Sequence, residues 1–242
     1  MRFPILSASA LVLTAGVAMA AEHGATVRMG TEGAYPPYNF LNDDGEVAGF
    51  EREVGDELCA RAELTCEWVT NDWDSIIPNL VSGNYDTIIA GMAINDQRDE
   101  VIDFTQPYIP PASSAFAAMG EVDLSGAVIA AQTGTVQASH VATMDGATLV
   151  EFATPEETVA AVRNGEADAV LADRAFLVPI VENDAELSFV GEAVKLDDGI
   201  GVGLRESDTE LKETLNAAIQ SMKDDGSLNT LIEKWFPDSD TF

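Results

Sequence analysis

Residues 148–172, TLVEFATPEETVAAVRNGEADAVLA, carry the pattern that decides the fold. The apolar run 148–152 predicts a strand, and residues 154–164, which open with Thr-Pro-Glu-Glu, predict a helix with a favourable start. Residues 169–172 predict a second strand. Because a strand, a helix and a strand in this order form a parallel crossover unit, the stretch indicates an α/β fold.

The same alternation continues on both sides of this stretch. Further strands are predicted at residues 26–31, 65–69, 85–90 and 127–131, and further helices at 50–61, 73–82, 137–144, 209–223 and 228–236. The elements fall into two blocks, separated near the Ile-Pro-Pro-Ala sequence at 109–112. We therefore expect two lobes with a cleft between them: residues 21–110 and 201–242 form lobe 1, and residues 111–200 form lobe 2.

The charge balance restricts the partners of the protein. The chain has 242 residues, with 42 acidic side chains against 12 Lys and Arg, a net charge of −30. Such a surface cannot neutralise phosphates, so nucleic acid and anionic membranes are disfavoured as partners. A hydrophobic content of 46% is enough for a sizeable core. The acidity is then either an adaptation for solubility or high salt, or a field that steers a cationic ligand.

The first twenty residues resemble a leader rather than part of the fold. Arg2 precedes an uncharged apolar run from Ile5 to Met19, and Ala18-Met19-Ala20 supplies an A-x-A cleavage site. The run is short for a membrane helix and lacks stop-transfer charges after it. We expect residues 1–20 to be a signal peptide and the remainder to be a soluble protein of the periplasm of a Gram-negative cell.

The two cysteines, Cys59 and Cys66, fit that oxidising compartment. A helix that ends near Ala62 and a strand that starts near Leu64 would bring them together as a disulfide. The alternative, a metal site, is disfavoured because a structural zinc ion needs four ligands. We therefore expect a structural disulfide and no metal.

Motifs of covalent chemistry are missing from the sequence. Neither His23 nor His140 lies in H-E-x-x-H, and no G-x-S-x-G or Walker A motif occurs. The glycines of residues 199–203, GIGVG, do not match G-x-G-x-x-G, and we expect them to serve a strand that crosses between the lobes. The sequence therefore predicts neither an enzyme nor a cofactor.

Recognition groups instead follow the predicted strands, where ligands of α/β proteins bind. Arg98 lies after the strand that ends at Ala90, at an expected helix start, and can clamp a carboxylate; the alternative is an exposed surface arginine. The loop at 132–136 can hold an anion through its amides and the Thr135 hydroxyl. Asp173 follows the strand 169–172 and suits an ammonium group. A carboxylate clamp and an ammonium acceptor together specify an α-amino acid.

These residues belong to a longer series of ordered matches. Residues 26–236 resemble the periplasmic amino-acid-binding proteins of ABC importers (solute-binding protein family 3), and in particular the lysine/arginine/ornithine and histidine binders. The resemblance implies a two-lobed type II periplasmic binding protein fold. Its motifs are residues 30–38 (GTEGAYPPY), 49–51 (GFE), 73–78 (WDSIIP), 86–92 (DTIIAGM), 98 (R), 104–108 (FTQPY), 132–135 (QTGT), 165–169 (GEADA), 201–205 (GVGLR) and 235–236 (WF).

The resemblance implies roles for the residues at the backbone end of the ligand. Arg98 and the amides near Thr135 and Val136 would bind the α-carboxylate. Asp173 and the backbone carbonyl of Gly91 would take the α-amino group.

The resemblance also implies a place for the ligand side chain. Tyr35 and Trp73 would sandwich it, by apolar contact and cation–π attraction, and Glu32 would face its far end. The alternatives are ordinary core packing for the two aromatic residues and a solvated surface acid for Glu32.

The sequence departs from the resemblance at Ala90, Gly91 and Ala93, where the basic binders show hydroxyl residues. The change removes hydrogen bonds to the ligand and opens volume beside the ammonium group. Either the affinity is lower, or the ligand carries a larger or substituted amine, as in an opine. A plain cationic amino acid is the favoured ligand.

We therefore predict a monomeric protein that captures an amino acid and delivers it to an ABC permease in the inner membrane by lobe closure. Two other classes remain open at this stage. One is an enzyme on the same scaffold that resembles cyclohexadienyl dehydratase, and the other is a sensory domain that acts on a receptor in trans.

Overall fold

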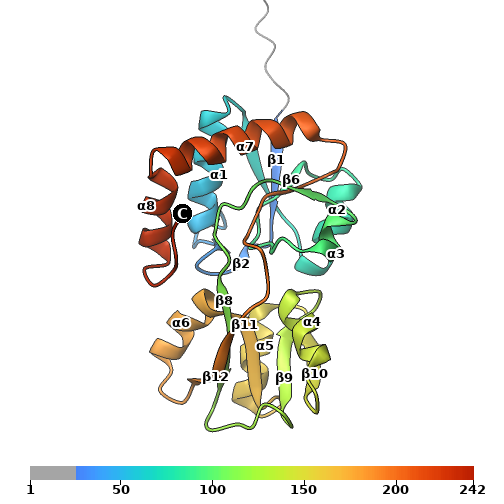
Figure 1. Ribbon diagram of the computed structural model, residues 1–242, viewed down its shortest axis with the longest axis vertical. Coiled ribbons are helices and arrows are strands. Elements are labelled where there is room, and N and C mark those ends of the chain that lie inside the picture. The colour runs from blue at the N-terminus through green and yellow to red at the C-terminus, as the bar shows by residue number, and fades with distance from the viewer. Residues whose placement is uncertain (1–25) are drawn as a thin grey trace, which may run out of the picture.

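The alternation of strands and helices builds two lobes, one above the other in Figure 1, in the computed structural model. The structure describes residues 26–242, so the predicted signal peptide lies outside the described residues. Each lobe is built on a five-stranded sheet, and a small three-stranded sheet accompanies the first. The predicted two-lobed α/β fold is confirmed.

The sheet of lobe 1 has the strand order β5-β1-β6-β13-β7. Strand β1 pairs in parallel with β5 and β6, and β13 runs antiparallel between β6 and β7. The bounds of these strands are β1 Val27–Thr31, β5 Cys66–Thr70, β6 Thr87–Ile88, β7 Asp103–Phe104 and β13 Gly203–Leu204. The small sheet consists of β2 Ala34–Tyr35, β3 Asn39–Leu41 and β4 Val47–Ala48. The helices of this lobe are α1 Phe50–Arg61, the 3₁₀ turn η1 Trp73–Ser75, α2 Ile76–Val81, α3 Asp96–Asp99, α7 Thr209–Asp224 and α8 Ser227–Trp235.

The sheet of lobe 2 has the order β10-β9-β11-β8-β12. Strand β9 is parallel to β10 and β11, and β8 runs antiparallel between β11 and β12. Its strands are β8 Ser113–Ala118, β9 Val128–Gln132, β10 Thr148–Phe152, β11 Ala169–Asp173 and β12 Ser188–Lys195, and its helices are α4 Val136–Thr143, α5 Pro155–Asn164 and α6 Arg174–Asn183. Thr154 and Glu157 form the capping box of α5, as its opening residues predict.

Two segments cross between the lobes side by side (Figure 1). The first leads from lobe 1 into β8, and the second leads from β12 back to β13. They meet at Ile200, whose carbonyl accepts from the Tyr108 amide at 2.8 Å and whose amide donates to the Ile109 carbonyl at 3.0 Å. Gly201 lies on the second segment, where a Cβ atom would come within 2.8 Å of Ile94. The glycines of 199–203 therefore serve this crossing, as expected.

Some elements differ from the sequence prediction. The predicted strand 85–90 is regular only at Thr87–Ile88. The predicted helix 73–82 starts as a 3₁₀ turn. Helix α6 was not predicted, since Pro179 stands inside it and its N-cap residue makes no capping bond.

The predicted disulfide is confirmed. Cys59 lies in the last turns of α1 and Cys66 begins β5, and the two sulfur atoms are bonded. Between them the Leu64 amide donates to the Cys59 carbonyl at 2.9 Å, so the connection is a tight turn. None of the helices in residues 26–242 is long and apolar enough to cross a membrane.

Candidate functional site

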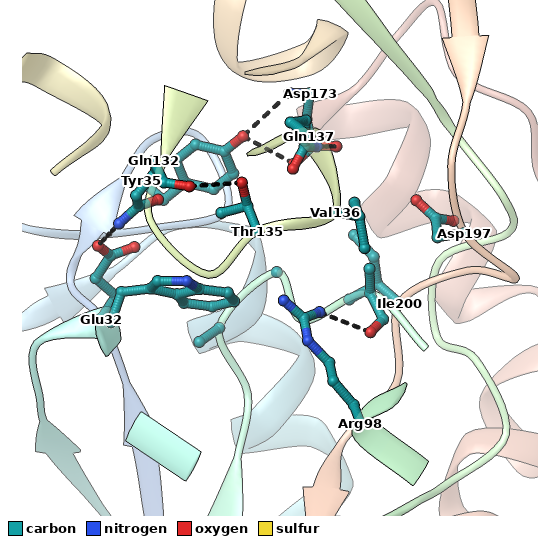
Figure 2. Close-up of a pocket in the computed structure, with 14 residues that line it drawn as sticks. Glu32, Tyr35, Arg98, Gln132, Thr135, Val136, Gln137, Asp173, Asp197 and Ile200 are labelled. Carbon is teal, nitrogen blue, oxygen red and sulfur yellow. Dashed lines mark hydrogen bonds between the residues drawn. The ribbon is translucent and has the colours of Figure 1, made fainter. Parts of the chain in front are cut away.

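A small cavity of about 30 Å³ lies between the lobes, at the carboxyl ends of β1, β6, β9 and β11. Figure 2 shows its lining. The structure brings all the predicted ligand-binding residues together around it, namely Glu32, Tyr35, Trp73, Gly91, Ala93, Arg98, Thr135, Val136 and Asp173.

Arg98 is buried at the lobe interface, which excludes the reading of an exposed surface arginine. Its guanidinium donates to the Ala93 carbonyl at 2.7 Å within lobe 1 and to the Gly134 carbonyl at 3.2 Å in lobe 2. Burial lowers its pKa to about 10, against the opposing effect of Asp173 and Asp197, so the group stays cationic at neutral pH. A buried guanidinium with N–H donors to spare is suited to a carboxylate.

The expected contribution of a helix start at Arg98 is not found. Helix α3 is a single turn, and the Asn95 side chain already accepts from the Arg98 amide at 2.9 Å. The guanidinium, rather than the backbone at this position, therefore faces the cavity (Figure 2).

Thr135 caps α4, which starts at the cavity. Its hydroxyl accepts from the Ala138 amide at 3.1 Å and donates to the Gln132 carbonyl at 2.7 Å. The hydroxyl is thus engaged in the helix cap here, and its predicted contact with an anion stays a prediction. The amide of Val136, the first residue of α4, has no acceptor within its own helix. A carboxylate can bind there beside Arg98.

Asp173 ends β11, directly before α6. The Tyr35 hydroxyl donates to its Oδ2 at 2.8 Å, and the Gln137 amide donates to its Oδ1 at 3.0 Å. Burial raises the pKa of Asp173 to about 6, and Asp197 adds to the rise, while the Tyr35 bond and Arg98 oppose it. These two hydrogen bonds fix the carboxylate in place. An ammonium group beside it would stabilise its charged form.

The two aromatic residues differ in their surroundings. Tyr35 is buried, and its ring stacks on Phe176 of lobe 2 at 4.7 Å and on Tyr38 at 5.3 Å between centroids. Tyr35 therefore takes part in core packing and also lines the cavity. Trp73 is half-buried, and the Arg98 guanidinium lies 5.3 Å from its ring centroid. Trp73 also lines the cavity.

Glu32 lies on the opposite side of the cavity from Asp197 (Figure 2), and it is not a solvated surface acid. The Gln132 side chain of lobe 2 donates to it at 2.6 Å. Burial raises the pKa of Glu32 to about 7, with smaller rises from Asp72 and Glu51, and the Gln132 bond opposes them. A cation beside Glu32 would stabilise the charged form of its carboxylate.

A second layer of hydrogen bonds lies behind the cavity wall. Glu51 is fully buried, and it accepts from the Gly91 amide at 2.6 Å, from Asn39 at 2.7 Å and from the Tyr108 hydroxyl. Gly91 has a φ of 61°, a left-handed conformation that favours glycine. Glu51 therefore fixes the turn whose carbonyl is the predicted acceptor for the α-amino group.

Sequence reasoning missed several residues of the lining. Ala90 was noted only for its missing hydroxyl, and four further residues had no assigned role: Gln132, Gln137, Asp197 and Ile200. Gln132 lies in the 132–135 motif and could have been found from it. Asp197 and Ile200 lie on the second crossing segment, whose path depends on the packing of the lobes. Within residues 26–242, no group of three or more metal-ligating side chains is arranged to hold a metal ion.

The fold and the cavity define a two-lobed binding protein for a small ligand with a carboxylate and an amine. Residues 27–238 match the model of the bacterial extracellular solute-binding proteins, family 3, and the chain belongs to this family. Membership confirms the prediction of a solute-binding protein rather than an enzyme. The family implies an amino acid as ligand and an ABC permease as partner.

Three relatives illustrate the similarity. The lysine/arginine/ornithine-binding periplasmic protein of Escherichia coli (strain K12) is 31% identical, over 94% of this chain and 95% of its own length. The octopine-binding periplasmic protein of Rhizobium meliloti is 29% identical, over 98% of both chains. A crystal structure of a periplasmic His/Glu/Gln/Arg/opine family-binding protein from Silicibacter pomeroyi in complex with lysine has a TM-score of 0.87 and 70% identity, over 89% of this chain and 100% of that chain.

Proposed function

We propose that this protein binds a cationic amino acid, with lysine as the first candidate, and delivers it to an ABC permease. The observation that carries the proposal is the crystallised relative with 70% identity, which holds lysine. The charges in the cavity support the same ligand. Arg98 suits its α-carboxylate, Asp173 its α-amino group and Glu32 its side-chain amine.

Lobe closure would follow from the way the site is divided. Arg98 and Glu32 belong to lobe 1, whereas Asp173 and the amide of Val136 belong to lobe 2. A ligand that bridges them stabilises the closed form, which is the form offered to the permease. We propose the lobe boundaries expected from the sequence, residues 21–110 and 201–242 for one lobe and 111–200 for the other, and the two crossing segments support them.

Two further parts of the proposal concern the state of the protein in the cell. Relatives of this family are periplasmic, and residues 1–20 have the sequence pattern of a signal peptide. We also propose that the mature protein is a monomer, since one chain contains both halves of the site.

An opine is the second candidate ligand. Ala90 and Ala93 carry no hydroxyl groups and leave space beside the predicted ammonium site, and one curated relative is named as an octopine binder. An N-substituted amino acid would need this space, whereas lysine would not.

A thermal-shift screen against the common amino acids, opines and polyamines tests the proposal. A ligand at 100 times its Kd adds about 2.7 kcal/mol to the free energy of unfolding. For a protein of this size, that corresponds to a rise in Tm of about 5–10 °C. We expect lysine, arginine or ornithine to give the largest shift. A screen in which only acidic or only neutral amino acids stabilise the protein would refute the proposal.

A further inference from the structure

We propose that Asp197 is a third acceptor for the α-amino group of the bound lysine and strengthens its binding through this group. The inference rests on the proposed function and deepens it, because it concerns how the same cavity selects its ligand.

The second crossing segment places Asp197 beside the cavity. Ile200 of this segment forms a β-bridge with Ala93, and the Ile94 amide donates to the Gly199 carbonyl at 2.9 Å. The segment therefore runs alongside the residues that lead to Arg98. Figure 2 shows Asp197 near Val136 and Ile200, on the opposite side of the cavity from Glu32. Asp197 thus belongs to the end of the cavity where the α-carbon groups of the ligand are expected.

The Asp197 carboxylate is held in a defined position. Its Oδ1 accepts from the Gly199 amide at 2.8 Å. Its charge acts on both predicted anchors, since it favours the cationic form of Arg98 and raises the pKa of Asp173. Asp197, Arg98 and Asp173 all line the same cavity.

The number of acceptors at this end explains why a further acid is needed. An ammonium group has three N–H donors, each of which must find an acceptor when water is excluded. Asp173 and the Gly91 carbonyl are two predicted acceptors. Ala90 and Ala93, the other lobe 1 residues on this wall, have no polar side-chain atom. Asp197 supplies the missing acceptor.

Asp197 also marks the edge of the cavity. Among the described residues, only Val136 and Asp197 line both the cavity and a more open groove of about 670 Å³ outside it. Its neighbour Asp198 is exposed and lines the outer groove alone. The two adjacent acids therefore form a matched pair, because Asp197→Asn and Asp198→Asn change the net charge equally but only the first changes the cavity.

The test compares the two variants with three ligands by calorimetry or tryptophan fluorescence. Norleucine has the α-amino group without the side-chain amine, and ε-aminocaproate has the side-chain amine without the α-amino group. We expect Asp197→Asn to weaken lysine and norleucine by the same factor, about 10- to 100-fold, because both lose one charged hydrogen bond. ε-Aminocaproate, titrated into the millimolar range, should be weakened less than threefold. Asp198→Asn should bind all three as the wild type does.

Three results would overturn the inference. A loss of lysine affinity below threefold in Asp197→Asn would show that Asp197 does not contact the α-amino group. A much larger loss for lysine than for norleucine would assign Asp197 to long-range attraction of cations. Equal losses of affinity for all three ligands, or a lower Tm of the ligand-free variant, would show that Asp197 only stabilises the second crossing segment. If wild-type protein binds no lysine at all, the proposed function fails first, and the two failures are thereby distinguished.

Discussion

Replacement of Arg98 by alanine tests the carboxylate clamp. Two of the five N–H donors of the guanidinium go to the Ala93 and Gly134 carbonyls, so three remain for a ligand carboxylate. Removal of one partner from a buried, hydrogen-bonded charge pair costs about 2–5 kcal/mol, which is a loss of affinity of about 30- to 5,000-fold. The upper part of this range is expected, because Arg98 is buried and water cannot replace it easily.

The assay is a calorimetric titration of the Arg98→Ala variant with lysine and with norleucine. Both ligands carry the α-carboxylate, so both should lose affinity by the same factor. Arg163→Ala is the matched control, since Arg163 is exposed on α5, pairs with Asp184 at 3.0 Å and changes the net charge by the same amount. The ligand-free Arg98→Ala protein should unfold cooperatively. Wild-type affinity for either ligand in this variant would refute the clamp.

The remaining predictions concern the other anchors, the pH and the disulfide. Asp173→Asn keeps the shape of the side chain but not its charge, so calorimetry should show a loss of about 2–5 kcal/mol for lysine; unchanged affinity would place the amine elsewhere. The pKa of Glu32 is raised to about 7 and that of Asp173 to about 6, so both acids bind protons as the pH falls from 8 to 5. Lysine affinity should therefore fall by about 100-fold or more over this range. Glu32→Gln should weaken lysine at pH 8 and flatten this profile, and an unchanged profile would exclude Glu32 from the site. In the ligand-free protein the effect of pH has the opposite sign. Protonation of Glu32 and Asp173 stabilises the fold, and this stabilisation is lost as the pH rises through 6 and 7, so the Tm should be higher at pH 5 than at pH 8. Loss of the disulfide in Cys59→Ser/Cys66→Ser should lower the free energy of unfolding by about 2.5 kcal/mol. Lysine affinity should not change, because the two residues lie on α1 and β5 away from the cavity, and a change in affinity would contradict this separation.

The sequence was sufficient to predict the parts of the fold that depend on local patterns. Helix α1 occupies the predicted residues 50–61, and the capping residues of α5 lie where its opening predicts. Periodicity and caps act over a few residues, so they can be read without knowledge of the neighbours. Helix α6 shows the limit, because Pro179 within it and the missing cap weaken its local signal.

The candidate site also has residues that local patterns predict and residues that depend on the packing of distant segments. Arg98 and Asp173 follow predicted strands, and the rule that ligands bind at the carboxyl ends of parallel strands brings them together. The sequence did not reveal that the Thr135 hydroxyl caps α4, because a residue that can bind an anion can also cap its own helix. Asp197 could not be found, since its place depends on the path of the second crossing and its pairing with Ala93 and Ile94.

Competition between lysine and glutamate for the wild-type protein tests directly whether the protein prefers a cationic amino acid. The two ligands share the groups on the α-carbon and differ in the charge of the side chain, which Glu32 is expected to face. Calorimetric titration with lysine, repeated in the presence of excess glutamate, gives the preference in one experiment. We expect one lysine bound per chain and no displacement by glutamate. Displacement of lysine by glutamate, or tighter binding of glutamate alone, would contradict this expectation.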